Sequence, residues 1–130
     1  MNTSKSLDEL EIYNLPNSGL DSNLVTECSR LFKLPLSKLS VENLRLLIGQ
    51  GIGLEHLMPI ALSKLEENPL TESNLYAGDL LASVVKLPED FWVKYPDYNN
   101  RLVEIKLSVE DIADTLNNEI LPKLNSLKFS

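Results

Sequence analysis

The segment SVENLRLLIG, residues 40–49, constrains the fold more than any other part of the sequence. Its apolar side chains fall at positions i, i+3, i+6 and i+7, which places them on one face of an α-helix. They are Val41, Leu44, Leu47 and Ile48. The residues between them include Glu42, Asn43 and Arg45, which a strand buried on both faces would not carry. The segment therefore predicts a helix, with Ser40 as its N-cap.

Helical spacing recurs along the rest of the chain, and no alternating strand pattern of any length accompanies it. Leucine dominates the apolar residues, which favours helices over sheets. We therefore expect an all-α fold, a single-domain bundle of about seven to nine short helices over residues 1–130. Residues 1–20 would form an N-terminal arm or short helix, and residues 108–130 a C-terminal helix and tail.

Prolines and short polar residues predict where these helices begin and end. Pro35 and Pro96 are expected to end helices, and Pro122 to interrupt the C-terminal one. Pro88 has the place of a proline at the first position of a helix. The candidate N-caps are Ser6, Asp21, Ser40, Asp79 and Ser108.

Gly49, Gly51 and Gly53 follow the first segment directly and invite comparison with a phosphate-binding loop. A dinucleotide loop needs Gly-x-Gly-x-x-Gly after a strand, whereas these glycines are spaced Gly-x-Gly-x-Gly after a helix. We predict a helix–helix turn, in which Gly49 or Gly51 is left-handed and Gly53 lets the next helix approach closely. Pro59 falls within the apolar spacing of that next helix, which begins late, near Pro59, or bends there.

No set of residues with catalytic or metal-binding spacing stands out in the sequence. His56 is the single histidine, and the positions where a helical metal site would place a second ligand hold Pro59 and Ile60. Cys28 is the single cysteine, lies in a helical pattern, and is expected to be a small buried apolar residue. We therefore expect a protein that is not an enzyme and needs no cofactor or metal.

The net charge of −7 is unevenly distributed along the chain. Residues 1–65 hold six basic and seven acidic side chains, whereas residues 66–130 hold six basic and twelve acidic ones. This balance disfavours direct binding to nucleic acid, because such binding depends on Lys and Arg that neutralise phosphates. It favours a basic protein partner, although acidic residues that only keep the surface solvated would give the same pattern.

Aromatic residues occur in the acidic half, and aromatic side chains among acids can form the centre of a protein interface. For Tyr98 an interface role and plain exposure both stay open, whereas Phe91 is expected in the core. The candidate partner-binding residues are Glu66, Glu67, Glu72, Asp79, Asp97, Tyr98, Glu110, Asp111 and Asp114.

The sequence shows no apolar core of a signal peptide and no apolar run of about 18 residues that could span a membrane. We therefore expect a soluble, cytoplasmic protein without a membrane partner.

Two stretches resemble the bacterial contact-dependent growth inhibition (CDI) immunity proteins: LSVENLRLLIGQGIGLEHLMPIALSKLEENPL, and YAGDLLASVVKLPEDFW after it. The similarity covers roughly residues 24–106, and its most specific parts are LxxLIGQ-x-IGL, EENPL, GDLL and PEDFW. Gly51 stands where the family more often has Asn, and Ala77 where it has Pro. Both positions lie in expected turns. The C-terminal helix from Ser108 is longer than the family leads us to expect.

The resemblance implies a cytoplasmic antidote that binds the C-terminal toxin domain delivered by a neighbouring cell and blocks it. Many such toxins are nucleases, and an acidic surface would fit the basic cleft in which a nuclease holds phosphates. No catalytic residue carries over from the family. The alternative from another functional class is a helical adaptor or regulatory module whose protein partner is unrelated to toxins.

Overall fold

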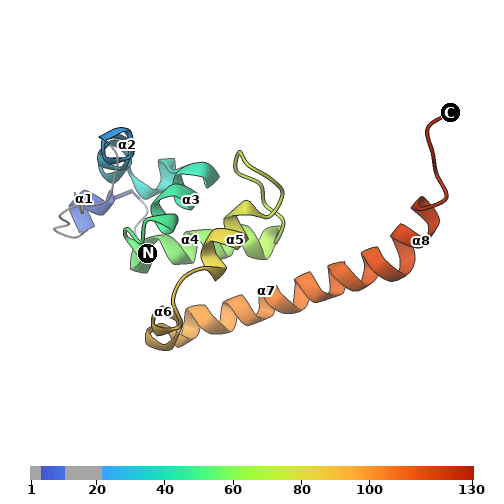
Figure 1. Cartoon of the computed structure of the whole chain (residues 1–130). Coiled ribbons are helices and arrows are strands. Elements are labelled where there is room, and N and C mark those ends of the chain that lie inside the picture. The colour runs from blue at the N-terminus through green and yellow to red at the C-terminus, as the bar shows by residue number, and fades with distance from the viewer. Residues whose placement is uncertain (1–3, 11–21) are drawn as a thin grey trace. The chain divides into compact units, whose positions relative to one another are not determined.

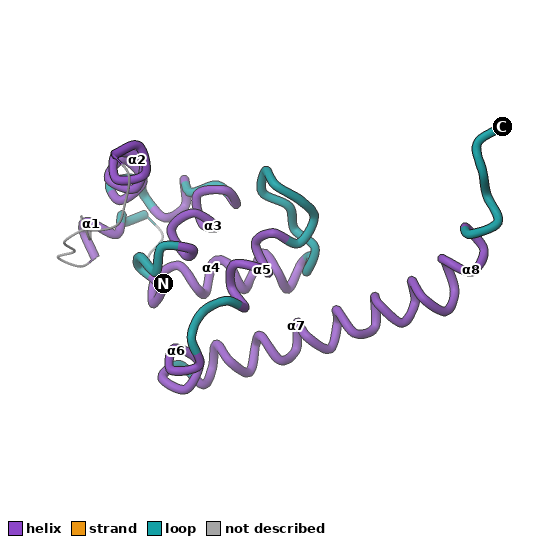
Figure 2. Tube along the Cα trace, in the orientation of Figure 1, coloured by secondary structure: helices purple, strands orange, loops and turns teal. Residues whose placement is uncertain are grey.

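The computed structural model describes residues 4–10 and 22–130, and within these ranges it contains helices and no strand. The prediction of an all-α fold is confirmed (Figures 1 and 2). The one isolated β-bridge in the described part joins Ser6 to Pro35. Within the same ranges, no helix combines the length and the hydropathy that crossing a lipid bilayer requires. The candidate cap Asp21 lies outside the described residues.

The chain divides into two compact units, residues 1–89 and 90–130. A single domain over residues 1–130 stays a prediction. The helices of the first unit, in chain order, are α1 (Leu7–Leu10), α2 (Ser22–Phe32), a short 3₁₀-helix (Leu36–Lys38), α3 (Val41–Gly49), α4 (Leu54–Glu67) and α5 (Asp79–Val85).

In the first unit α3 packs against both α4 and α5 (Figure 1). Most of the side chains buried in this unit are leucines. The apolar face predicted for residues 40–49 is confirmed, because Leu44, Leu47 and Ile48 are fully buried and Val41 is half-buried. Further fully buried side chains come from the other helices of this unit: Leu7, Leu31, Leu57, Met58, Leu62, Leu65, Leu80 and Val84.

Two of the predicted N-caps are reciprocal capping boxes. At α3 the backbone N–H of Asn43 donates to Ser40 Oγ at 3.1 Å, and the Ser40 N–H donates to Asn43 Oδ1 at 3.0 Å. At α1 the Glu9 N–H donates to Ser6 Oγ at 3.2 Å, and Glu9 Oε1 lies 3.4 Å from the Ser6 nitrogen. Each box satisfies backbone donors that the first helical turn leaves without a partner.

The glycine segment forms a helix–helix turn, as predicted, but Gly53 has a different neighbour from the one expected. Gly49 is the last residue of α3, and Gly51 takes the left-handed conformation with φ 71°. Gly53 is itself the N-cap of α4, with φ 64°. A Cβ atom on Gly53 would lie 2.7 Å from both terminal methyl groups of Leu7, so α1 makes the close approach.

Helix α4 begins at Leu54, and the alternative of a late start near Pro59 is wrong. The Gly53 carbonyl accepts hydrogen bonds from the N–H groups of His56 and Leu57, at 3.0 and 2.9 Å, and starts the helix before the proline. Pro59 therefore lies inside α4, where it removes one backbone donor.

The second unit contains α6 (Glu89–Lys94), which begins at its boundary, α7 (Pro96–Thr115), a π-helical turn (Leu116–Ile120) and α8 (Leu121–Leu124). Pro88 lies one residue before α6 and not at its first position, which corrects the prediction, whereas Pro96 does open α7. The prediction that Ser108 caps a separate helix is wrong, because Ser108 lies inside the 20-residue α7 and its hydroxyl donates to the Glu104 carbonyl at 3.4 Å.

The continuity of α7 follows from its apolar face. Leu102, Ile105, Val109 and Ile112 keep helical spacing across the position where a break is predicted. The prediction that Pro122 interrupts the C-terminal helix is confirmed in one sense: the α-helical geometry of α7 changes to a π-helical turn, which ends two residues before this proline. Pro122 itself lies in the first turn of α8.

Candidate partner-binding surface

The nine candidate contact residues fall into two groups, one in each unit. In the first unit Glu66 and Glu67 end α4, Glu72 lies in the loop between α4 and α5, and Asp79 opens α5. In the second unit all of them lie on α7: Asp97, Tyr98, Glu110, Asp111 and Asp114. Seven of the nine are exposed, whereas Asp79 is buried and Tyr98 is half-buried. The nine candidates are therefore distributed over two units, and on α7 Asp97 and Tyr98 lie near the start of the helix whereas Glu110, Asp111 and Asp114 lie near its end.

Asp79 is not a surface residue, which corrects its place among the candidate contacts. Its side chain is 1% exposed and accepts hydrogen bonds from the loop that precedes α5. The Ser73 N–H donates to Oδ1 at 2.7 Å and the Leu75 N–H to Oδ2 at 3.0 Å. The Ser73 hydroxyl also donates to Oδ2. Gly78 holds the N-cap position that the sequence analysis assigns to Asp79, so the carboxylate caps the loop instead of the helix.

Arg45 of α3 completes this buried arrangement. Its Nε donates to Ser73 Oγ at 3.0 Å and lies 4.0 Å from Asp79 Oδ2. From its spacing in the sequence, Arg45 is expected only on the polar side of α3. Its partners are 28 and 34 positions away along the chain, so no local pattern identifies them.

The environment of Asp79 favours its charged form. Burial by itself raises the pKa of this carboxyl, but hydrogen bonds from the Ser73 hydroxyl and from the backbone N–H groups of Ser73, Leu75 and Tyr76 lower it, to about 2. Asp79 is therefore ionised at neutral pH, and its negative charge is stabilised by hydrogen bonds inside the protein.

The loop that Asp79 holds, residues 68–78, carries apolar side chains on its outside. Leu70 is 42% exposed, Leu75 61% and Tyr76 53%. The loop is fixed at a further point, where the Asn74 side-chain amide donates to Glu42 Oε1 at 2.7 Å. Leu75 is a residue that sequence reasoning missed, because an isolated leucine between two helices is normally expected to be buried.

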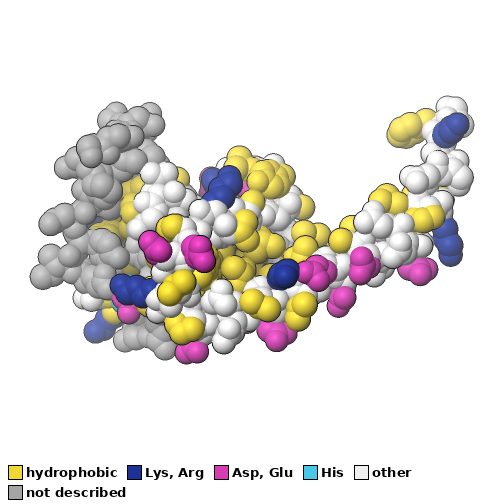
Figure 3. Space-filling model, turned by 60° about the horizontal axis from the view of Figure 1, so that its bottom comes forward, with side chains coloured by type: hydrophobic (Ala, Val, Ile, Leu, Met, Phe, Trp, Pro, Cys, Tyr) yellow, Lys and Arg dark blue, Asp and Glu magenta, His cyan; other side chains and the backbone are white. Residues whose placement is uncertain are grey.

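On α7 the candidate carboxylates lie on the side away from the apolar face. In the view of Figure 3, acidic side chains line the lower side of this long helix, with some exposed apolar side chains among them toward its start. Glu110 forms an exposed ion pair with Lys106, whose Nζ lies 3.6 Å from Oε1. Such an exposed pair one helical turn apart contributes only about 0.5 kcal/mol, so Glu110 is not held firmly by it.

Tyr98 belongs to an aromatic cluster at the start of the second unit. Its ring stacks on Tyr95 at a centroid distance of 5.3 Å and on Phe91 at 6.4 Å. Phe91 also meets Trp92 edge to face at 5.0 Å, and Lys94 Nζ lies 5.5 Å from the Tyr95 ring centroid. The prediction that Phe91 is in the core is confirmed. Tyr98 is a helical residue, and its ring packs within this cluster.

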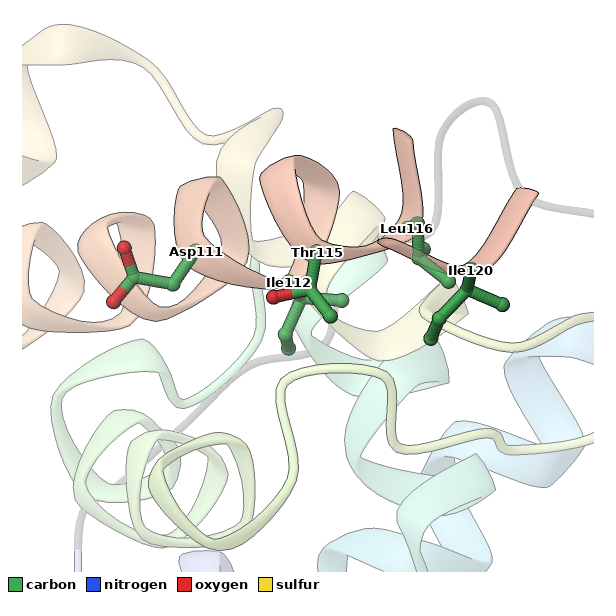
Figure 4. Close-up of a pocket in the computed structure, with 5 residues that line it drawn as sticks. All are labelled: Asp111, Ile112, Thr115, Leu116 and Ile120. Carbon is green, nitrogen blue, oxygen red and sulfur yellow. The ribbon is translucent and has the colours of Figure 1, made fainter. Parts of the chain in front are cut away.

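The turn after α7 creates an open recess between the end of that helix and the π-helical segment. It is lined by Asp111, Ile112, Thr115, Leu116 and Ile120, mostly through apolar atoms (Figure 4).

The part of the chain that the structure describes holds no group of three or more His, Cys, Asp or Glu side chains suited to a metal ion. Cys28 is fully buried, as predicted, and burial followed by the charge of Glu27 raises the pKa of its thiol. A buried thiol of raised pKa is a poor nucleophile.

The comparisons with known proteins agree with the resemblance seen in the sequence. The family model of the CDI immunity proteins matches residues 9–102, which leaves the C-terminal part of α7 and everything after it outside the match. No curated protein and no solved structure matches the chain. The family match covers well over half of the 130 residues, and the chain therefore belongs to the CDI immunity proteins.

Proposed function

We propose that the chain neutralises the toxin domain of a CDI system by binding it directly in the cytoplasm. Membership of the CDI immunity proteins is the observation that carries this proposal. The toxin is proposed to be a nuclease, and the bound surface of the chain to be acidic.

The charge distribution supports the acidic surface. The exposed candidate carboxylates are Glu66, Glu67, Glu72, Asp97, Glu110, Asp111 and Asp114. A nuclease needs a positively charged cleft to hold phosphates, and carboxylates can take the place of phosphates there. Opposite fields raise association rates toward about 10⁸ M⁻¹s⁻¹ at low salt. An antidote to a lethal enzyme also needs a slow dissociation rate, hence a nanomolar complex of about −12 kcal/mol.

The first experiment mixes the purified chain with the C-terminal domain of the CDI exoprotein encoded beside it. We expect a stoichiometric complex in calorimetry and loss of the toxin's nuclease activity when the chain is present. A toxin domain that neither binds nor loses activity would contradict the proposal and favour an adaptor with a partner of another kind.

The second experiment tests the acidic surface with one charge reversal from each unit. Glu67→Lys and Asp97→Lys should each slow association by about threefold to tenfold at low salt, and the difference should shrink as salt screens the charges. Asp8→Lys is the matched control, because Asp8 is an exposed acid outside the candidate set. If both variants behave like the control, the acidic-surface mechanism is excluded while the immunity role stands.

A further inference from the structure

We infer that the loop between α4 and α5, residues 68–78, is a preformed docking element whose apolar tip, Leu75 and Tyr76, enters an apolar recess rimmed by Lys and Arg on the toxin domain. The inference rests on the proposed function, since it takes the toxin domain as the partner. It assigns the central contact to residues outside the set of acidic candidates.

The exposure of the loop tip is the first observation. Leu75 and Tyr76 are adjacent, and each is more than half exposed, while Leu70, at the base of the same loop, is 42% exposed. Figure 1 shows this loop, in yellow-green, extending beyond the ends of the two helices that it joins. Exposed apolar residues that are clustered and rimmed by polar ones are typical of protein interaction sites. Tyr is also enriched among the residues that dominate binding energy at interfaces.

The second observation is that the loop is ordered without a partner. Its backbone N–H groups at Ser73 and Leu75 donate to the buried carboxylate of Asp79, and Asn74 is tied to Glu42 of α3. The Gly78 N–H donates across the base of the loop to the Leu70 carbonyl at 3.1 Å. A tip held in one conformation loses little conformational entropy on binding, which strengthens the complex.

The third observation is the charge around the tip, which selects the partner. The stretch from Glu66 to Val85 contains four acidic residues and no Lys or Arg. Asp79 is buried beside Arg45, whose side chain is itself mostly buried, so the charges of this stretch that reach solvent include those of Glu67 and Glu72. The exposed Glu42 of α3, which holds Asn74, adds a carboxylate beside the loop. An apolar tip within an acidic rim is complementary to an apolar recess within a basic rim. Carboxylates at this position repel nucleic acid and anionic lipid, which leaves a basic protein surface as the occupant.

The test measures the affinity of the full-length chain for the toxin domain after truncation of the tip. Leu75→Ala and Tyr76→Ala should each raise Kd by tenfold or more, mainly through faster dissociation. Val85→Ala is the matched control, because Val85 is an apolar side chain of the same unit, 56% exposed and outside the loop, and it should leave Kd within twofold. Circular dichroism and thermal melting should be unchanged in all three, since none of these side chains is buried.

The outcomes separate this inference from the function on which it rests. Tight binding by the parent chain together with unchanged Kd in the two loop variants would overturn the docking loop and leave the immunity role intact. A parent chain that does not bind the toxin domain at all would overturn both.

Amide hydrogen exchange of the chain alone tests the preformed state of the loop. The Ser73 and Leu75 amides should exchange much more slowly than the amide of Glu72, for which no hydrogen bond is shown. Exchange of the Ser73 and Leu75 amides at the rate of an unfolded peptide would overturn the claim that the loop is ordered before binding.

Discussion

The carboxylate of Asp79 accepts hydrogen bonds from both the backbone N–H and the hydroxyl of Ser73, and this pair joins the first residue of α5 to the loop before it. Arg45 donates to the same hydroxyl from α3, so one buried acid connects two helices and a loop. Asp79 is therefore not part of the exposed candidate surface. Its carboxylate instead holds the loop that carries Leu75 and Tyr76 in place.

Asp79→Asn should lower the free energy of unfolding by about 2 kcal/mol, because the amide group turns one acceptor into a donor that faces other donors. Urea denaturation followed by circular dichroism measures this change. Glu67→Gln is the matched control, since it removes the same charge from an exposed side chain, and it should change stability by less than about 0.5 kcal/mol. Equal effects in the two variants would mean that the hydrogen bonds to Asp79 contribute nothing to stability.

The contribution of Asp79 should depend on pH below about 4. Its pKa falls from 3.8 to about 2 in the folded protein, so the unfolded chain takes up this proton more readily than the folded one. The stabilisation is therefore complete above the unfolded value and is lost as the pH falls through the folded one. The stability difference between the parent chain and Asp79→Asn should shrink from about 2 kcal/mol at pH 6 to below about 1 kcal/mol at pH 2.5. A difference that stays constant over this range would contradict the lowered pKa.

The sequence predicted the features whose causes are local. Ser40 and Ser6 are N-caps because the partner of each box lies three residues further on, and α3 is helical because its own spacing demands it. The arrangement of Asp79 with Ser73 and Arg45 could not be predicted, because it depends on α3 lying against α5. At Ser108, by contrast, the local sequence led to a wrong prediction. Its local preference for a cap is overridden, because the apolar face of α7 continues through that position.

Ser40→Ala and Ser108→Ala should therefore have opposite effects, although each serine is followed by valine and glutamate. The first removes the acceptor of the Asn43 N–H and should cost about 1 kcal/mol. The second replaces a serine inside a helix with the best helix former, and should be neutral or stabilise by up to about 0.5 kcal/mol. Helix content followed by circular dichroism during urea unfolding gives both values. If Ser108→Ala destabilises the protein, Ser108 acts as an N-cap after all, which would contradict its position inside α7.

The three glycines after α3 should respond to alanine in a graded way. Gly49 lacks the positive φ of the other two and has open space around it, so Gly49→Ala should be neutral or stabilise by up to about 1 kcal/mol. Gly51→Ala also meets no neighbour, but its φ of 71° is strained for a side chain and should cost about 1 kcal/mol. Gly53→Ala adds a collision with Leu7 to a similar strain, and should cost about 2 to 4 kcal/mol.

A double-mutant cycle separates the two effects at Gly53. In a Leu7→Ala background the collision is absent, so Gly53→Ala should cost only the conformational strain, close to the value for Gly51→Ala. The Leu7→Ala variant alone loses a fully buried side chain and supplies the baseline of the cycle. If the effects of Leu7→Ala and Gly53→Ala simply add, then a Cβ at position 53 does not clash with Leu7. The glycine would then be required for its backbone conformation alone.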